Sequence, residues 1–148
     1  MSKFLLAGGG TGGHVNPLLA LGEHLRKQKH EVIALGTKEG LESRLVPNRG
    51  FELITIPRLP LPRRLSFGSF SYPFRLLLAS LQVARVIRVR EIDCVVGFGG
   101  YASAPAYLAA WFTRTTLVVH EANALAGFAN KLGARLTKWV AVTFPNSN

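Results

Sequence analysis

Short apolar runs alternate with amphipathic segments along the whole chain. Runs of mainly apolar, often β-branched residues predict six strands, at 4–7, 31–35, 52–56, 92–98, 115–120 and 138–143. Apolar residues spaced three or four apart predict helices at 17–29, 39–46 and 72–90, one ending at 112, and one at 125–136. This alternation predicts an α/β fold: a doubly wound, Rossmann-like parallel sheet with right-handed crossovers and strand order 3-2-1-4-5-6.

The stretch 3–17, KFLLAGGGTGGHVNP, joins the first strand to the first helix through a glycine turn. Glycines without a Cβ let a ligand reach backbone N–H groups, and the N-terminus of the following helix, expected at Asn16 and Pro17, favours an anion. His14 adds a side chain that titrates near neutral pH. The stretch therefore predicts an enzyme site for a phosphorylated substrate.

Three interpretations of this glycine turn compete. Its glycines fit the dinucleotide-binding pattern G-x-G-x-x-G, but the second strand ends in Gly36-Thr37-Lys38 without the acidic residue that holds a ribose. They also fit a P-loop, but His14 and Val15 stand where Lys and Ser/Thr are required. The third interpretation is a tight turn with no ligand, although a bare turn rarely needs so many glycines.

A second glycine turn at 97–105 and the turn at 120–123 follow the fourth and fifth strands. In the predicted sheet, strands one and four are neighbours at the switch point, so these turns and the first one share the carboxyl edge where ligands bind. Two helix N-termini facing each other suit a diphosphate. The candidate diphosphate-binding residues are Gly9, Gly10, Thr11, Gly12, Gly13, Gly99, Gly100, Tyr101 and Ser103.

Two titratable residues are candidates for catalysis. His14 is either a general base or a hydrogen-bonding partner of phosphate. Glu121, the only acid predicted at this edge, either orients or charge-stabilises His14, takes a proton itself, or caps the following helix, as Asn123 also can. The histidines and acids lack metal-ligand spacing, so no metal is expected, and no nucleophile–base pair is evident.

The long helix predicted at 72–90 has two apolar faces. One face, with Leu76, Ser80, Val83, Ala84 and Ile87, suits the core. The opposite face combines apolar side chains with arginines and contains no acid, as in a helix lying on an anionic membrane. The alternative is that another part of the protein covers it. The residues of this opposite face are Phe74, Arg75, Leu78, Leu81, Arg85 and Arg88.

The composition and net charge of the chain limit the kinds of binding partner it can have. With 148 residues, 48% of them hydrophobic, the chain can form one domain with a core, and its net charge of +10 implies an anionic partner. We expect no nucleic acid, because no base-reading helix or aromatic platform is evident. The apolar run at the start of the chain is too short for a signal peptide. The uncharged run 94–113 is long enough to span a membrane, but glycines and Pro105 interrupt it, which argues against a membrane span.

Two further segments carry expectations. Cys94, the single cysteine, is expected to be an inert buried thiol in a reducing compartment. The segment 57–66, PRLPLPRRLS, is expected to be an extended loop, either a basic flap over an anionic ligand or a solvated linker.

Three motifs together resemble the MurG family, the peptidoglycan N-acetylglucosaminyltransferases that convert lipid I to lipid II. They are GGGTGGH at 8–14 with Asn16 and Pro17, GFGGYASAP at 97–105, and HEANALAG at 120–127 with Asn130. The resemblance covers essentially all 148 residues, in order and spacing. One departure is Ala122, where the family usually has glutamine.

The resemblance implies the N-terminal half of an inverting, two-domain GT-B glycosyltransferase. Residues 1–148 would form the domain that binds the undecaprenyl-diphosphate-linked acceptor and the membrane, inactive alone, while the absent C-terminal domain would bind most of UDP-GlcNAc. Both glycine loops would hold the acceptor diphosphate, with His14 as the base or an acceptor-binding residue and Asn123 and Asn130 as substrate-binding residues. Phe112 would join the membrane-facing residues, on the cytoplasmic face of the bacterial membrane, and no cofactor is implied.

Two other classes of protein remain open as interpretations of the sequence. A natural short protein could be the acceptor-binding, membrane-anchoring subunit of a split glycosyltransferase. An NADP-dependent Rossmann oxidoreductase would use Lys38 and Arg44 to meet the 2′-phosphate.

Overall fold

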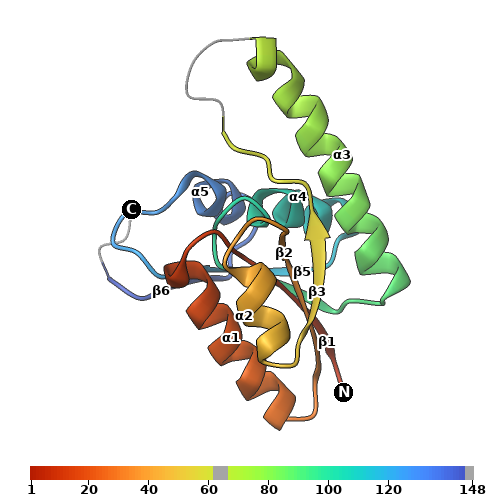
Figure 1. Cartoon of the computed structure of the whole chain (residues 1–148), viewed down its shortest axis with the longest axis vertical. Coiled ribbons are helices and arrows are strands. Elements are labelled where there is room, and N and C mark those ends of the chain that lie inside the picture. Colours follow the sequence, from red (N-terminus) through yellow and green to blue (C-terminus); the bar gives the residue numbers. More distant parts are fainter. Residues whose placement is uncertain (62–66, 146–148) are drawn as a thin grey trace.

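A computed structural model describes residues 1–61 and 67–145 of the chain (Figure 1). Its six strands form one parallel sheet in the order β3-β2-β1-β4-β5-β6, which confirms the predicted fold class and strand order. The strands are β1 (Lys3–Ala7), β2 (Glu31–Thr37), β3 (Glu52–Ile56), β4 (Cys94–Gly97), β5 (Thr116–Glu121) and β6 (Val140–Val142). The helices are α1 (Gly12–Lys27), α2 (Glu42–Asn48), α3 (Phe67–Val89), α4 (Ser103–Thr113) and α5 (Phe128–Ala134).

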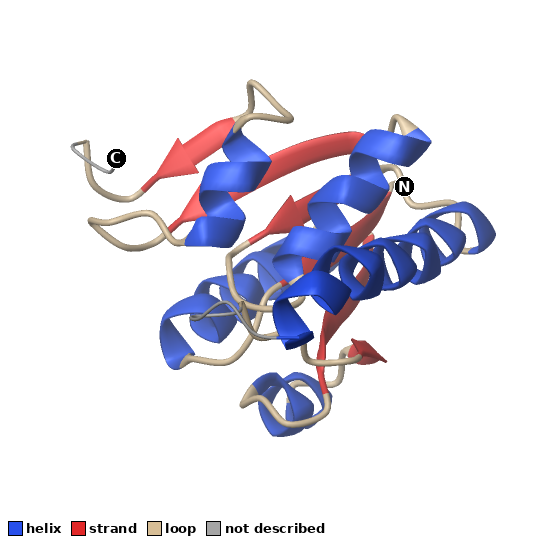
Figure 2. Ribbon diagram, turned by 90° about the horizontal axis from the view of Figure 1, so that it is seen from above, coloured by secondary structure: helices blue, strands red, loops and turns tan. Residues whose placement is uncertain are grey.

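Helices cover both faces of this sheet (Figure 2). On one face, α1 and α2 pack on the inner strands through a core that includes Leu6, Val15 and Val46. On the other face, α3, α4 and α5 build a second core that includes Val83 and Tyr107. Strands β1 and β4 are nearly continuous apolar runs because helices bury both of their faces.

Several element boundaries differ from the prediction. Helix α1 begins at Gly12 rather than at Asn16 or Pro17, so the last two glycines of the turn form its first helical turn, after Thr11 in extended conformation. Pro17, the sixth residue of α1, has no N–H to donate to the Gly13 carbonyl, so α1 lacks one intrahelical hydrogen bond there. Helix α5 is shorter than predicted, because residues 122–127 form a turn stabilised by side chains of the site.

The two faces of α3 divide as the pattern predicts. Val83, Ala84 and Ile87 are buried, whereas Phe74 is 64% exposed and Leu78 is 51% exposed. Leu81 and the three arginines of the same face are also exposed, and so are Phe70, Leu77 and Val89. Within the described residues, no helix is both long enough and apolar enough to cross a membrane.

Cys94 is only half-buried, at the start of β4. Desolvation, and then the charge of Asp93, raises the pKa of its thiol to about 11. The thiol is therefore protonated and unreactive at neutral pH, as expected from the sequence, although it is less buried than expected.

Candidate functional site

The two glycine turns touch each other at the carboxyl edge of the sheet. Gly100 has φ +90°, and a Cβ placed on it would lie only 2.4 Å from the carbonyl oxygen of Gly9. Gly99 has φ +95° and approaches the ring of His14, whose Nε2 would lie 2.9 Å from a Cβ at Gly99. The sequence-based expectation that these turns share one rim is confirmed, and glycine is required where they meet.

His14 lies in the first turn of α1 with its ring held by the loop that precedes it. Its Nδ1 is 3.0 Å from the carbonyl oxygen of Gly9 and 3.3 Å from the Thr11 hydroxyl. A carbonyl oxygen can only accept, so the first contact places the proton of a neutral imidazole on Nδ1. Nε2, on the side of Gly99, is then left with a lone pair directed towards the second glycine turn.

Glu121 is buried, at 2% exposure, and its two oxygens accept hydrogen bonds from neighbouring turns. The donors are the backbone N–H and side-chain amide of Asn123 at 2.8 and 2.9 Å, the amide of Asn130 at 2.8 Å, and the N–H of Gly127 at 3.3 Å. Desolvation raises the pKa of this carboxyl, but these hydrogen bonds outweigh desolvation and leave the pKa below its ordinary value of 4.5. This geometry favours a carboxylate that holds the turn over one that takes a proton.

The candidate residues Asn130 and Ser103 are also committed to the protein itself. Asn130 is 3% exposed; it donates to Glu121 and to the carbonyl of His120, and accepts from the Tyr107 hydroxyl at 2.6 Å. The Ser103 hydroxyl is fully buried between the Gly99 N–H, 3.0 Å away, and the carbonyl oxygens of Ala7 and Gly99. The expectation of a ligand-facing Ser103 hydroxyl is corrected: it fixes the second glycine turn.

Glu42 is a second acid at this edge, so the expectation that Glu121 is the only one is wrong. The sequence analysis did not single out Glu42. Its side chain is 1% exposed, and it accepts hydrogen bonds from the N–H of Gly10 and from the N–H and hydroxyl of Thr37, each at 2.8 Å. The available signal was the spacing of Glu42 and Val46, which places both on the buried face of α2. The N–H of Gly10 points inward to Glu42 and is not available to a ligand. The N–H groups of Gly12 and Gly13, at the start of α1, have no intrahelical acceptor.

The side chain of Arg58 packs against the ring of Tyr101. The guanidinium carbon of Arg58 lies 4.7 Å from the ring centroid, and Arg58 donates to the Tyr101 hydroxyl at 3.5 Å. The first residues of the segment 57–66 thus approach the site, with Leu59 buried, while residues 62–66 of that segment lie outside the described part of the chain.

A cavity of about 170 Å³ lies where these elements converge. Its polar side is formed by His14, the second glycine turn, Glu121 and Asn130, and its apolar side by Leu59, Leu61 and Tyr72. Among the described residues, no group of three or more His, Cys, Asp or Glu side chains is arranged to hold a metal ion.

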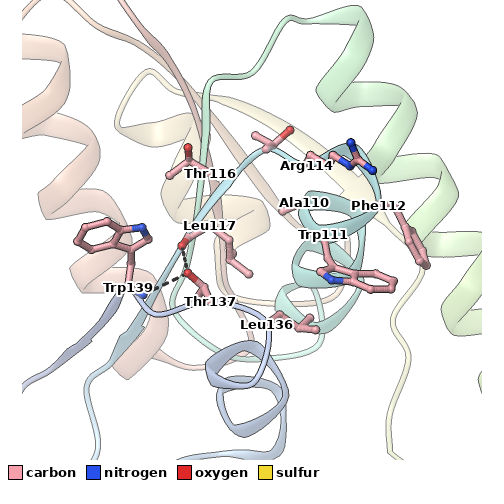
Figure 3. Close-up of a pocket in the computed structure, with 10 residues that line it drawn as sticks. Ala110, Trp111, Phe112, Arg114, Thr116, Leu117, Leu136, Thr137 and Trp139 are labelled. Atoms are coloured by element: carbon pink, nitrogen blue, oxygen red, sulfur yellow. Dashed lines mark hydrogen bonds between the residues drawn. The ribbon is translucent and has the colours of Figure 1, made fainter.

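A larger hollow, of about 640 Å³, lies at the opposite edge of the sheet (Figure 3). It is lined by Trp111 and Phe112 at the end of α4, by the start of β5 and by Trp139, and the Thr137 hydroxyl donates to the Leu117 carbonyl at 2.7 Å. Neither His14 nor either glycine turn lines it. The smaller cavity is therefore the better catalytic candidate.

Acidification tests the buried carboxylate network. A carboxyl with a lowered pKa in the folded state stabilises the protein above its unfolded pKa, and this contribution is lost as pH falls through the folded pKa. We expect the free energy of unfolding to fall below pH 4.5, and Glu121→Gln to lower it by about 1–3 kcal/mol at pH 7 while flattening its acid dependence. Urea unfolding between pH 3 and 7 measures both, with Glu91→Gln as an exposed control; equal pH profiles in the Glu121 variant and the parent would contradict this role.

Comparison with known proteins defines the class. Residues 4–142 match the glycosyltransferase family 28 N-terminal domain, so the chain belongs to this glycosyltransferase family. This membership removes the oxidoreductase alternative.

Individual relatives agree. The chain is 56% identical over 146 residues to the UDP-N-acetylglucosamine–N-acetylmuramyl-(pentapeptide) pyrophosphoryl-undecaprenol N-acetylglucosamine transferase of Leifsonia xyli, covering 97% of this chain and 41% of that protein. The enzyme of the same name from Clavibacter sepedonicus is 54% identical over 149 residues, with 99% and 41% covered. The chain thus spans about two fifths of the length of these relatives.

Solved structures show the same relationship. The crystal structure of Acinetobacter baumannii MurG superposes with a TM-score of 0.86 at 33% identity, covering 100% of this chain and 43% of that one. The Staphylococcus aureus MnaA–UDP structure, with a TM-score of 0.66 at 15% identity and coverage of 99% and 39%, shares the fold alone.

Proposed function

We propose that this chain is the acceptor-binding half of an inverting glycosyltransferase. The enzyme moves GlcNAc from UDP-GlcNAc to the C4 hydroxyl of MurNAc-pentapeptide linked to undecaprenyl diphosphate (lipid I), giving lipid II. The observation that carries the proposal is the direct contact of the two glycine turns, with His14 between them, in a chain of this family. The donor-binding half lies outside residues 1–148.

The acceptor diphosphate fits between two helix N-termini. Helices α1 and α4 both begin at the carboxyl edge, directly after the two glycine turns, and the N–H groups of their first turns lack intrahelical acceptors, although that of Ser103 donates to the Gly100 carbonyl at 3.3 Å. Thr11 is exposed beside the first of these helices, and Tyr101 with Arg58 lies beside the second. Arg58 adds a positive charge to the donors expected from the sequence.

His14 is the general base of the proposed transfer. The acceptor C4 oxygen attacks the anomeric carbon of UDP-GlcNAc, its proton passes to His14 Nε2, and the bond from the anomeric carbon to the UDP oxygen breaks. Attack opposite the leaving group inverts the anomeric centre. Glu121, Asn123 and Asn130 stabilise the turn that forms the far wall of the cavity.

A transfer assay on the full-length gene product tests this function. With UDP-GlcNAc and a polyprenyl-diphosphate-linked MurNAc-pentapeptide, we expect a disaccharide-linked lipid and UDP as products. The 148-residue chain alone should bind the acceptor without turnover. Transfer by the isolated chain, or no transfer by the full-length product, would contradict the proposal; transfer only after a separate donor-binding chain is added would identify the split-subunit alternative.

We also propose that the exposed face of α3 lies on the cytoplasmic surface of an anionic membrane. Exposed apolar side chains at 74, 78 and 81 share this face with three arginines, and Phe112, 39% exposed, lies beside α3 at the end of α4 (Figure 3). Each arginine near an anionic surface contributes about 1 kcal/mol. This arrangement would place the acceptor site near the lipid that carries the acceptor.

Vesicle binding tests the membrane face. Replacing Arg75, Arg85 and Arg88 together by glutamine should weaken binding to phosphatidylglycerol vesicles about 10²-fold, from the loss of about 1 kcal/mol per charge. Binding to phosphatidylcholine vesicles should change little. Co-sedimentation at fixed salt measures both.

The matched control removes the same charge elsewhere. Lys27, Lys29 and Arg44 are exposed and lie on or directly after α1 and α2, on the face of the sheet opposite α3. Their joint replacement by glutamine should leave vesicle binding within a few-fold of the parent. Equal losses in the two triple variants would show a net-charge effect and refute a specific face.

A further inference from the structure

Glu42 is a buried carboxylate directly beneath the first glycine turn. One oxygen, Oε2, accepts the N–H of Gly10 at 2.8 Å, and the other, Oε1, accepts the N–H and the hydroxyl of Thr37, each at 2.8 Å. These partners are neutral donors. A fixed negative charge below a loop expected to bind an anion is electrostatically unfavourable for that ligand, so its presence requires a reason.

The protein is built closely around this carboxylate. A Cβ placed on Gly9, Gly36 or Gly40 would lie 2.3, 2.4 and 2.1 Å from atoms of the Glu42 side chain. Gly9 in the first glycine turn, Gly36 in β2 and Gly40 in the bend before α2 thus surround the carboxylate. Desolvation raises the pKa of Glu42, but the hydrogen bonds from Gly10 and Thr37 outweigh it, so the pKa is lowered and the group is ionised at neutral pH.

The peptide group between Gly9 and Gly10 connects Glu42 to His14. Its N–H, on Gly10, donates to Glu42 at 2.8 Å, and its C=O, on Gly9, lies 3.0 Å from His14 Nδ1. In a trans peptide the N–H and C=O point in opposite directions, so the carboxylate and the imidazole bind opposite sides of one planar unit. Hydrogen bonds in such a chain polarise one another.

We propose that Glu42 is a positioning residue that acts on His14 through the Gly9–Gly10 peptide. The carboxylate orients the peptide and increases the negative charge on its oxygen. That oxygen then holds the proton of His14 on Nδ1 and keeps Nε2 free to accept a proton. The role of Nε2 as a base rests on the proposed function, whereas the relay itself is a property of the unliganded chain.

The first test measures the His14 tautomer without substrate. In the 148-residue chain with ¹⁵N-labelled histidine, at a pH where the ring is neutral, the ring shifts should show the Nδ1–H form as the main tautomer. In Glu42→Gln, which has one acceptor oxygen instead of two, the Nε2–H form should increase. Glu39→Gln removes the same charge from an exposed position three residues earlier and should leave the tautomer unchanged.

The second test separates this relay from general support of the loop. Thr37→Val removes the hydroxyl bond to Oε1 but keeps the bond from Gly10 to Oε2, so it should lower stability without shifting the tautomer. In the full-length enzyme, Glu42→Gln should lower kcat on the order of 10-fold, equal to about 1.4 kcal/mol, with KM within about twofold.

The outcomes are distinct. An Nε2–H tautomer in the parent chain would overturn the relay even if no variant folds, and so would an unchanged tautomer in a folded Glu42→Gln variant. A confirmed tautomer shift together with no transfer by the full-length enzyme would instead reject the proposed function and leave the relay intact.

Discussion

Replacing His14 by alanine is expected to slow transfer by the full-length enzyme about 10²–10⁴-fold, the usual contribution of a general base. The reason is geometric: the Gly9 carbonyl binds Nδ1, so Nε2 faces the second glycine turn with a free lone pair. Since this interaction acts in the transition state, kcat should fall while KM for the acceptor changes little. Steady-state rates with both substrates varied provide the measurement.

Two comparisons make this result interpretable. His24 is exposed on α1 and bonds only to Gln28 among the contacts the structure describes, so His24→Ala should retain the parental rate. A His14→Ala enzyme with normal kcat and a raised acceptor KM would show that His14 binds phosphate and that the base lies elsewhere. That was the second role left open by the sequence.

The sheet and its ligand-binding edge could be predicted because both depend on local patterns. Apolar runs of four to seven residues specify buried parallel strands, and glycines placed directly after β1 and β4 fall at the carboxyl edge once the strand order is known. The exposed face of α3 followed from its 100° periodicity in the same way. Helix starts were less certain, because glycines are poor helix formers and α1 nevertheless includes two of them in its first turn.

The roles of individual polar residues could not be predicted because they depend on long-range contacts. Ser103 follows a glycine turn, which suggests a hydroxyl that donates to a phosphate. In the structure its hydroxyl donates instead to the carbonyl of Ala7, a residue 96 positions away. Glu42 stands in an ordinary amphipathic helix, and only the folded chain brings it under Gly10. Spacing along the sequence cannot report such a contact, whereas Gly40, in the bend two residues before Glu42, is a weak indication of it.

This distinction changes how the site is understood. The sequence suggested a set of side chains that all face the ligand. In the structure, Ser103, Asn130, Glu121 and Glu42 are buried and hold the turns. In the proposed site, the groups left for a ligand are mainly backbone amides, His14, Thr11 and Tyr101. Buried, fully bonded polar groups make such a site rigid, and rigidity is what backbone donors need in order to stabilise charge.

Replacing Gly100 by alanine is therefore expected to destabilise the scaffold itself. The new Cβ would lie 2.4 Å from the Gly9 carbonyl oxygen, and the residue would keep φ at +90°. Backbone strain of this kind costs about 1–3 kcal/mol, and the clash with a neighbouring backbone adds to it, so we expect the free energy of unfolding to fall by about 3 kcal/mol. Urea unfolding of the 148-residue chain measures this change.

Gly127 provides the matched control. It is the N-cap of α5 with φ −70°, and a Cβ placed on it would have no atom within 4 Å, so Gly127→Ala should lower stability only by about 1 kcal/mol, because alanine is a poorer N-cap than glycine. If Gly100→Ala were as stable as Gly127→Ala, the two glycine turns would not be in contact in solution. The proposed diphosphate site would then be refuted, because the amides of α1 and α4 would have no fixed separation from which to bind two phosphates.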